Sequence, residues 1–94
     1  MDLHDYRITG HAARRMRTRR IPEEIVALAI LAPESVEARP PGRLVVQAHV
    51  RLGVPEKTYI VRVILDVDRS PPEVVTVYVT SKLSKYGKPG GNRS

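Results

Sequence analysis

The chain has 94 residues, of which 41% are hydrophobic, and this size suits one domain with a single modest core. It contains no cysteine, which excludes disulfides, thiolate nucleophiles and cysteine-bound zinc. Sixteen Lys and Arg residues against ten Asp and Glu residues give a net charge of +6, which favours a polyanionic partner. The chain has no apolar stretch of about 18 residues, so we expect a soluble, cytoplasmic protein that does not enter a membrane.

The positive charge is concentrated at the two ends of the chain. Residues 1–20 carry six basic and two acidic groups, residues 21–81 carry six and eight, and residues 82–94 carry four and none. Clustered positive charge attracts phosphates and speeds encounter with nucleic acid. The alternative is a solubilising surface on an arginine-rich protein, and charge alone leaves both interpretations open.

A first helix is expected from Gly10 to Arg19. Thr9 is a suitable N-cap, and Ala12, Ala13 and Met16 form an apolar stripe along the helix. Five of the seven residues from Arg14 to Arg20 are arginine, so cations are expected over most of the remaining helix surface.

A second helix is expected to begin at Ile21-Pro22-Glu23-Glu24, because Pro suits a first helical turn and carboxylates suit the positive end of the helix dipole. Pro33 ends this helix. The residues predicted to form its buried face are Ile25, Leu28, Ala29 and Ala32.

After the second helix the hydrophobic period changes from 3.6 to 2, which indicates strands. Residues 34–39 predict a short edge strand, and longer strands are expected at 43–52, 58–67 and 74–81. The expected fold is α+β, with two N-terminal helices packed on one face of a twisted three- to four-stranded antiparallel sheet. A single domain would span residues 1–86, followed by a flexible basic tail at 87–94.

Three polar side chains are predicted to meet on the other face of this sheet. Matching the apolar sides of the strands puts Leu65 opposite Val75 and therefore Arg62 opposite Tyr78, and the same rule can pair His49 with Arg62. Opposed residues lie about 4.5–5.5 Å apart at Cβ. His49, Arg62 and Tyr78 would then bracket one phosphodiester.

These three residue types suit metal-free RNA cleavage, which needs a base for the 2′-hydroxyl proton, a cation for the charge on phosphorus and an acid for the leaving oxygen. His49, Arg62 and Tyr78 are therefore candidate catalytic residues. The alternatives are a structural pairing of Arg62 with Asp66 or Glu73, a solvent-facing His49 and a cross-strand packing role for Tyr78.

His11 is a second candidate catalytic residue, because Arg14 and Arg15 follow it at i+3 and i+4 and the three could grip a phosphate. Alternatively, His11 helps to pack the start of the helix against the sheet. The candidate nucleic-acid contacts are Arg14, Arg15, Arg19, Lys82 and Lys85. No metal or cofactor is expected, since the histidines lack ligand spacing and no glycine-rich phosphate loop occurs.

The run from Ile8 to Ile25, ITGHAARRMRTRRIPEEI, resembles the opening of the bacterial domain-of-unknown-function family 4258. Members of that family typically begin with a His-Ala-x-x-Arg-Met-x-x-Arg-Gly-Ile helix pair. Val75–Tyr78 and Ser81–Tyr86 are similar to the family's last strand and tail, so the resemblance covers roughly residues 6–86. Arg20 stands where the family pattern often has Gly, so the turn between the helices is expected to differ.

That family is similar in architecture to the RelE/ParE-type toxins and BrnT, whose fold is two helices on a curved antiparallel sheet. The resemblance implies a metal-independent ribonuclease that acts on RNA or at the ribosome and is held in check by an antitoxin protein. By the same resemblance, the residues expected to be functional are His11, Arg15, Arg62, Tyr78 and Lys82.

Two other interpretations stay open. One is a non-catalytic module that binds nucleic acid or the ribosome through the same basic surface. The other is a protein-interaction domain whose partner surface would be the outward Val45, Ile60 and Ile64. The edge strand at 34–39 could also accept an antitoxin strand or form a homodimer.

Overall fold

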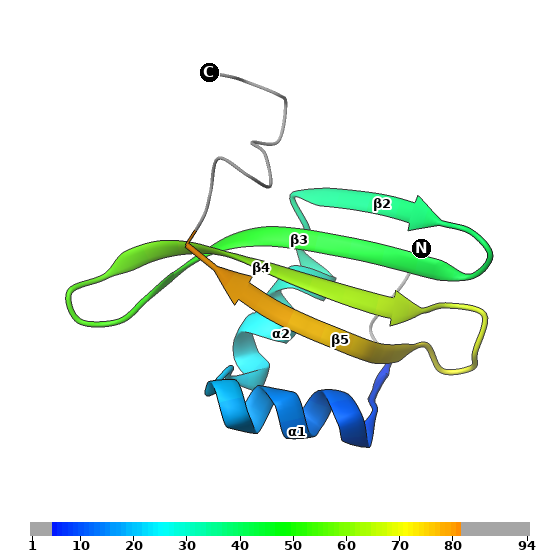
Figure 1. Ribbon diagram of the computed structural model, residues 1–94. Helices are drawn as coiled ribbons and strands as arrows, with labels where there is room; N and C mark the ends of the chain where they lie inside the picture. Colours follow the sequence, from blue (N-terminus) through cyan, green and yellow to red (C-terminus); the bar gives the residue numbers. More distant parts are fainter. Residues whose placement is uncertain (1–4, 82–94) are drawn as a thin grey trace.

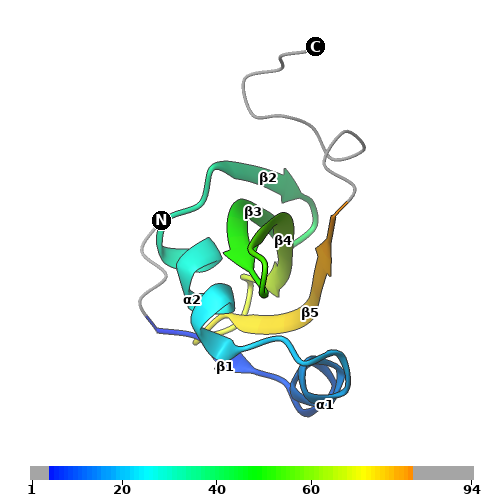
Figure 2. The ribbon, with the colours of Figure 1, turned by 90° about the vertical axis from the view of Figure 1, so that its left-hand side faces the viewer.

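The structure, a computed structural model, describes residues 5–81 (Figure 1). Its elements in chain order are β1 (Arg7–Ile8), α1 (Gly10–Arg19), α2 (Glu23–Leu31), β2 (Ser35–Arg39), β3 (Arg43–Leu52), β4 (Lys57–Asp66) and β5 (Glu73–Thr80). The strands form one five-stranded sheet in the order β1-β5-β4-β3-β2. Both helices lie on the same side of this sheet (Figures 1 and 2). The predicted α+β arrangement is therefore confirmed, although the sheet has five strands rather than three or four.

The additional strand, β1, makes the sheet mixed, because it pairs in parallel with β5 while β2 to β5 form the expected antiparallel meander. The backbone N–H of Arg7 donates to the Pro72 carbonyl at 2.8 Å, and that of Thr9 donates to the Val74 carbonyl at 3.1 Å. Two residues are too few to show a period-2 pattern, so this strand could not be predicted from the sequence.

α1 begins and ends at the predicted residues. The Thr9 side chain accepts a hydrogen bond from the Ala12 N–H at 3.1 Å, as expected of an N-cap. Ala12 and Met16 are buried, and the helix packs on β5. α1 therefore presents its arginine-rich surface away from the core.

The turn after α1 places Arg20 in the left-handed region, with φ 56° and ψ 47°. Its N–H donates to the Arg17 carbonyl at 3.2 Å, and the next N–H, from Ile21, donates to the Met16 carbonyl at 2.8 Å. A left-handed conformation costs a residue with a Cβ atom about 1–2 kcal/mol relative to glycine. The helix thus ends with the backbone conformation that glycine favours, but with arginine in that position.

The predicted buried face of α2 is confirmed at Ile25 and Ala29 and wrong at Leu28 and Ala32. Its buried residues are Ile25, Val26, Ala29 and Ile30, whereas Leu28 is 45% exposed and Ala32 is also exposed. After Glu24 the helix is apolar on all sides, so the sequence period does not specify which side packs on β3 and β4.

The β3–β4 pairing differs from the predicted register by two residues. Gln47 lies opposite Arg62, while His49 lies opposite Ile60, so the predicted pairing of His49 with Arg62 is wrong. A shift of two residues keeps every side chain on its face, so alternation cannot detect it. The turn at 53–56 sets the register by pairing Leu52 with Lys57.

The β4–β5 pairing places Arg62 opposite Tyr78, as predicted. Between Ile64 and Leu65 the register shifts by one residue, so that Leu65 lies opposite Val74 and not opposite Val75. Val74 is fully buried and Val75 is only partly buried. This β-bulge corrects the prediction that Val75 faces the core, and it needs an extra residue that strict alternation does not allow.

The core lies between the helices and the sheet and contains no buried aromatic residue among residues 5–81. The strand residues in it are Leu44, Val46, Ala48, Val61, Val63, Leu65, Val74 and Val77. The opposite side of the sheet, here called the open face, carries the alternate residues. The predicted basic tail at 87–94 lies outside the described residues.

Candidate functional site

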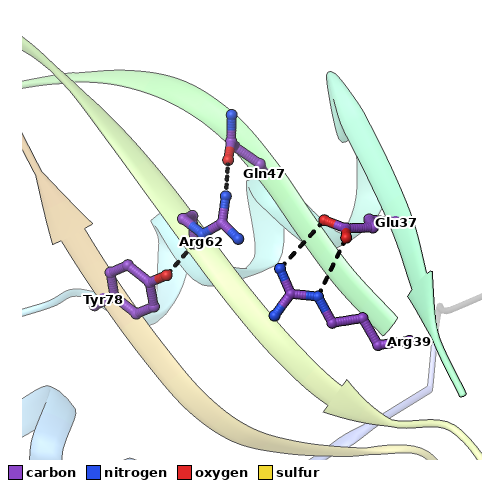
Figure 3. Close-up of polar contacts among 5 residues, drawn as sticks. All are labelled: Glu37, Arg39, Gln47, Arg62 and Tyr78. Carbon is purple, nitrogen blue, oxygen red and sulfur yellow. Dashed lines mark hydrogen bonds and ion pairs between the residues drawn. The ribbon is translucent and has the colours of Figure 1, made fainter. Parts of the chain in front are cut away.

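The centre of the open face carries a row of three polar side chains from three neighbouring strands, Gln47, Arg62 and Tyr78, here called the central row (Figure 3). Arg62 Nε donates to the Tyr78 hydroxyl at 2.8 Å, and Arg62 Nη1 donates to Gln47 Oε1. The guanidinium carbon also lies 5.7 Å from the centroid of the Tyr78 ring. These contacts fix the guanidinium between β3 and β5.

The central row is held partly below the surface. Gln47 is 5% exposed, and Arg62 and Tyr78 are partly buried. Keeping a guanidinium at such depth requires hydrogen-bond partners, because an unsatisfied buried charge is strongly unfavourable. The hydrogen bonds of the central row therefore hold the Arg62 guanidinium in a narrower range of positions than a surface arginine would have.

The two carboxylates considered as partners for Arg62 are engaged by other arginines. Asp66 Oδ1 lies 2.8 Å from Arg43 Nε, and Asp66 also contacts Arg69 at 3.8 Å. Glu73 contacts Arg69 at 3.7 Å and Arg7 at 3.7 Å. Asp66 is four residues from Arg62 along β4, or about 13 Å at the strand rise. This cluster of ion pairs is separate from the central row.

His49 lies beside the central row. Its Nδ1 is 2.6 Å from Glu34 Oε1, and its backbone N–H donates to the same oxygen at 3.1 Å. An ionised carboxylate can only accept, so Nδ1 is the nitrogen that donates to Glu34, and Nε2 is the nitrogen left to exchange a proton with a ligand. His49 follows Gln47 by two residues on the same face of β3, so its Cβ is diagonal to that of Arg62 at about 7–8 Å.

Glu34 and Gln47 are the two site residues that sequence reasoning missed. Glu34 precedes β2, and its backbone N–H donates to the Gln47 carbonyl at 2.8 Å, which brings its side chain to His49. This contact depends on the β2–β3 register, which the sequence pattern left open.

His11 does not share a site with Arg62. It lies on the outer surface of α1 and lines a shallow groove with Arg14, Arg15, Thr18 and Arg19. The inner surface of α1 faces the core, so the sheet separates this groove from the open face. The predicted trio of His11, Arg14 and Arg15 is thus brought together, but at a second surface. Lys82 and Lys85 lie outside the described residues.

The apolar side chains proposed as a partner surface are not available for one. Val45 is 3% exposed, Ile60 is 0% exposed and Ile64 is partly buried. The predicted edge strand is present as β2, and all five of its residues are exposed, with Val36 at 56%. On the open face its Arg39 and Glu37 side chains form an ion pair at 3.3 Å (Figure 3).

Within residues 5–81, no three His, Asp or Glu side chains gather in a way that could hold a metal ion. Over the same residues, neither helix has the length and hydrophobicity needed to cross a bilayer.

The fold and the open face define a small α+β domain with a fixed arginine at the centre of its sheet. A family model described as a domain of unknown function, DUF4258, matches residues 8–79, and the chain belongs to this family. The match runs from β1 to β5 and so includes α1 and the central row. No curated protein and no solved structure matched the chain.

Proposed function

We propose that this protein is a RelE-like toxin module, a metal-independent endoribonuclease whose cleavage site is the open face of the sheet. The observation that carries the proposal is the central row, in which Arg62 is fixed by Tyr78 and Gln47 with His49 beside it. Two helices on one side of an antiparallel meander are also consistent with the resemblance to RelE/ParE-type toxins and BrnT.

His49 is the base in this proposal. Its Nδ1–H is engaged by Glu34, so the Nε2 lone pair is directed away from that contact and can accept the 2′-hydroxyl proton. The 2′-oxygen then attacks phosphorus and forms the O2′–P bond. Glu34 acts as a positioning residue, because it fixes the imidazole tautomer and ring orientation.

Arg62 stabilises the charge that grows on the phosphoryl oxygens during this attack. Its position is set before the substrate arrives, so little reorganisation is needed in the transition state. Gln47 contributes by holding one nitrogen of the guanidinium.

Tyr78 is the acid. Its oxygen accepts a hydrogen bond from Arg62 Nε, so its own proton is directed elsewhere and can pass to the leaving 5′-oxygen as the P–O5′ bond breaks. The products are a 2′,3′-cyclic phosphate and a 5′-hydroxyl. Water returns the proton from His49 to Tyr78.

Cleavage can be tested with purified protein, 5′-labelled RNA and EDTA, using free RNA in one assay and messenger RNA on ribosomes in another. We expect fragments that end in a 2′,3′-cyclic phosphate. The His49→Asn variant should lose about 10²–10⁴-fold in rate. The Arg62→Gln variant should lose about 10²–10³-fold, and Tyr78→Phe should also slow the reaction.

Arg51→Gln is the matched control, because Arg51 lies on the same strand as His49 but is exposed and paired with Glu56 at 3.4 Å. It should cleave like the wild type, and circular dichroism should show that every variant is folded. Intact RNA in both assays, or equal cleavage by all variants, would overturn the proposal. A non-catalytic module that binds RNA or the ribosome would then be favoured.

The toxin part of the proposal can be checked in cells with the same variants. Induced expression of the wild type in a bacterial host should arrest growth and degrade RNA, whereas expression of His49→Asn should do neither. An antitoxin protein would protect the host by covering the open face.

A further inference from the structure

The arginines of α1 differ from most other arginines in the described part of the chain. Arg7, Arg39, Arg43, Arg51 and Arg69 each form an ion pair with a carboxylate. By contrast, five exposed arginines form no ion pair within residues 5–81, and these are Arg14, Arg15, Arg17, Arg19 and Arg20. α1 itself contains no acidic residue. Its positive charge is therefore left for a partner.

The stability of α1 does not require this cluster of unpaired arginines. Arg17 and Arg19 lie in the last turn, where the helix dipole favours cations. Arg14 and Arg15 lie mid-helix, outside the reach of that effect, and like charges at i and i+4, such as Arg15 and Arg19, destabilise a helix by about 0.2–0.5 kcal/mol. An anionic ligand on this surface would relieve the repulsion.

The composition of the groove on α1 indicates the class of ligand. Its five residues, His11, Arg14, Arg15, Thr18 and Arg19, include no Phe, Tyr or Trp and no Asn or Gln, so His11 supplies the single ring of the groove. Single-stranded nucleic acids are usually bound by stacking of bases on aromatic residues, and adenines are read by Asn or Gln. Arginine and hydroxyl donors suit phosphate oxygens, which carry no sequence information.

We propose that the outer face of α1, formed by His11, Arg14, Arg15, Thr18 and Arg19 and here called the α1 basic face, binds the sugar–phosphate backbone of a nucleic-acid double helix. Ten helical residues span about 15 Å, a length over which a duplex rises by roughly four base pairs at about 3.4 Å each. α1 lies on the helical side of the sheet (Figure 2), and the residues of the α1 basic face are exposed whereas Ala12 and Met16 face the core. The α1 basic face is therefore a second surface, and this inference holds whether or not the open face cleaves RNA.

The test measures binding of a 20-base-pair duplex by fluorescence anisotropy between 50 and 200 mM salt, with duplex RNA in one arm and duplex DNA in the other. Loss of two phosphate contacts in Arg14→Gln/Arg15→Gln should reduce the slope of log K against log salt by about 2 and weaken binding. Gln has nearly the helix propensity of Arg, so α1 should persist, as circular dichroism can verify.

The matched control is Arg39→Gln/Arg51→Gln, which removes the same charge from two exposed, ion-paired arginines of β2 and β3. It should keep the wild-type slope. Tight binding of duplex RNA, duplex DNA or both supports the inference, and the duplex with the higher affinity identifies the natural ligand. An unchanged slope in the α1 variant, or tighter wild-type binding to single-stranded RNA or to anionic lipid vesicles, would overturn it.

Discussion

At the scale of single residues, Tyr6 carries a partly buried phenol just before β1. Burial raises the pKa of Tyr6 above its ordinary value of 10.0, and the negative charge of Glu23 raises it further. The Tyr6 side chain packs against the core cluster. The folded state thus holds the phenol proton more tightly than the unfolded chain does, so this group's contribution to stability is complete below pH 10.0 and is lost as pH rises through the folded-state pKa.

We expect the wild type to lose stability faster than Tyr6→Phe as pH rises above 10, because phenylalanine has no proton to release. Thermal melting from pH 8 to 11.5 measures the difference. The melts at pH 8 serve as the reference, because the Tyr6 phenol is protonated there in both the folded and the unfolded chain. Parallel curves for the wild type and Tyr6→Phe would contradict the expectation.

Only some residues of the candidate site could be predicted from the sequence. Alternation correctly placed Arg62 opposite Tyr78, because both strands run through apolar positions that match on one face. It could not distinguish Gln47 from His49 as the other neighbour, since both lie on the same face of β3. Glu34 lies outside any regular element, and its contact with His49 depends on tertiary structure alone.

At the scale of single elements, α1 ends at a residue whose type does not suit its backbone conformation. Arg20 is in the left-handed conformation, so Arg20→Gly should stabilise the fold by about 0.5–1 kcal/mol. Arg19→Gly removes the same charge one residue earlier, inside the helix, and should destabilise by about 1 kcal/mol. Urea unfolding measures both, and a fall in stability for Arg20→Gly would contradict the argument.

The elements differ in how well local sequence specifies them. α1 was predicted to the residue because Thr9 caps it and its apolar stripe is narrow. α2 was predicted to exist, but its inward side was not, since nearly every residue after Glu24 is apolar. The bulge opposite Leu65 changes the register through packing, and no single-strand pattern records it.

At the scale of the whole molecule, stability depends on an aliphatic core between one layer of helices and one sheet. Leu65 is fully buried in it, so Leu65→Ala should reduce the free energy of unfolding by about 2–5 kcal/mol. Leu31 is 55% exposed at the end of α2, and Leu31→Ala should change it by less than about 0.5 kcal/mol. Chemical denaturation compares the two, and similar effects would mean that the core lies elsewhere.

The pairing of β1 with β5 joins the two ends of the described chain, since Arg7 and Ile8 lie beside Glu73 and Val74. α1 follows β1 directly and packs on β5. During synthesis, therefore, the arginine-rich helix leaves the ribosome more than fifty residues before the strand on which it packs. Contacts so distant in sequence form late, so the α1 segment leaves the ribosome before the surface on which it packs exists. An isolated helix of this length is only marginal in water, so the formation of β5 completes α1.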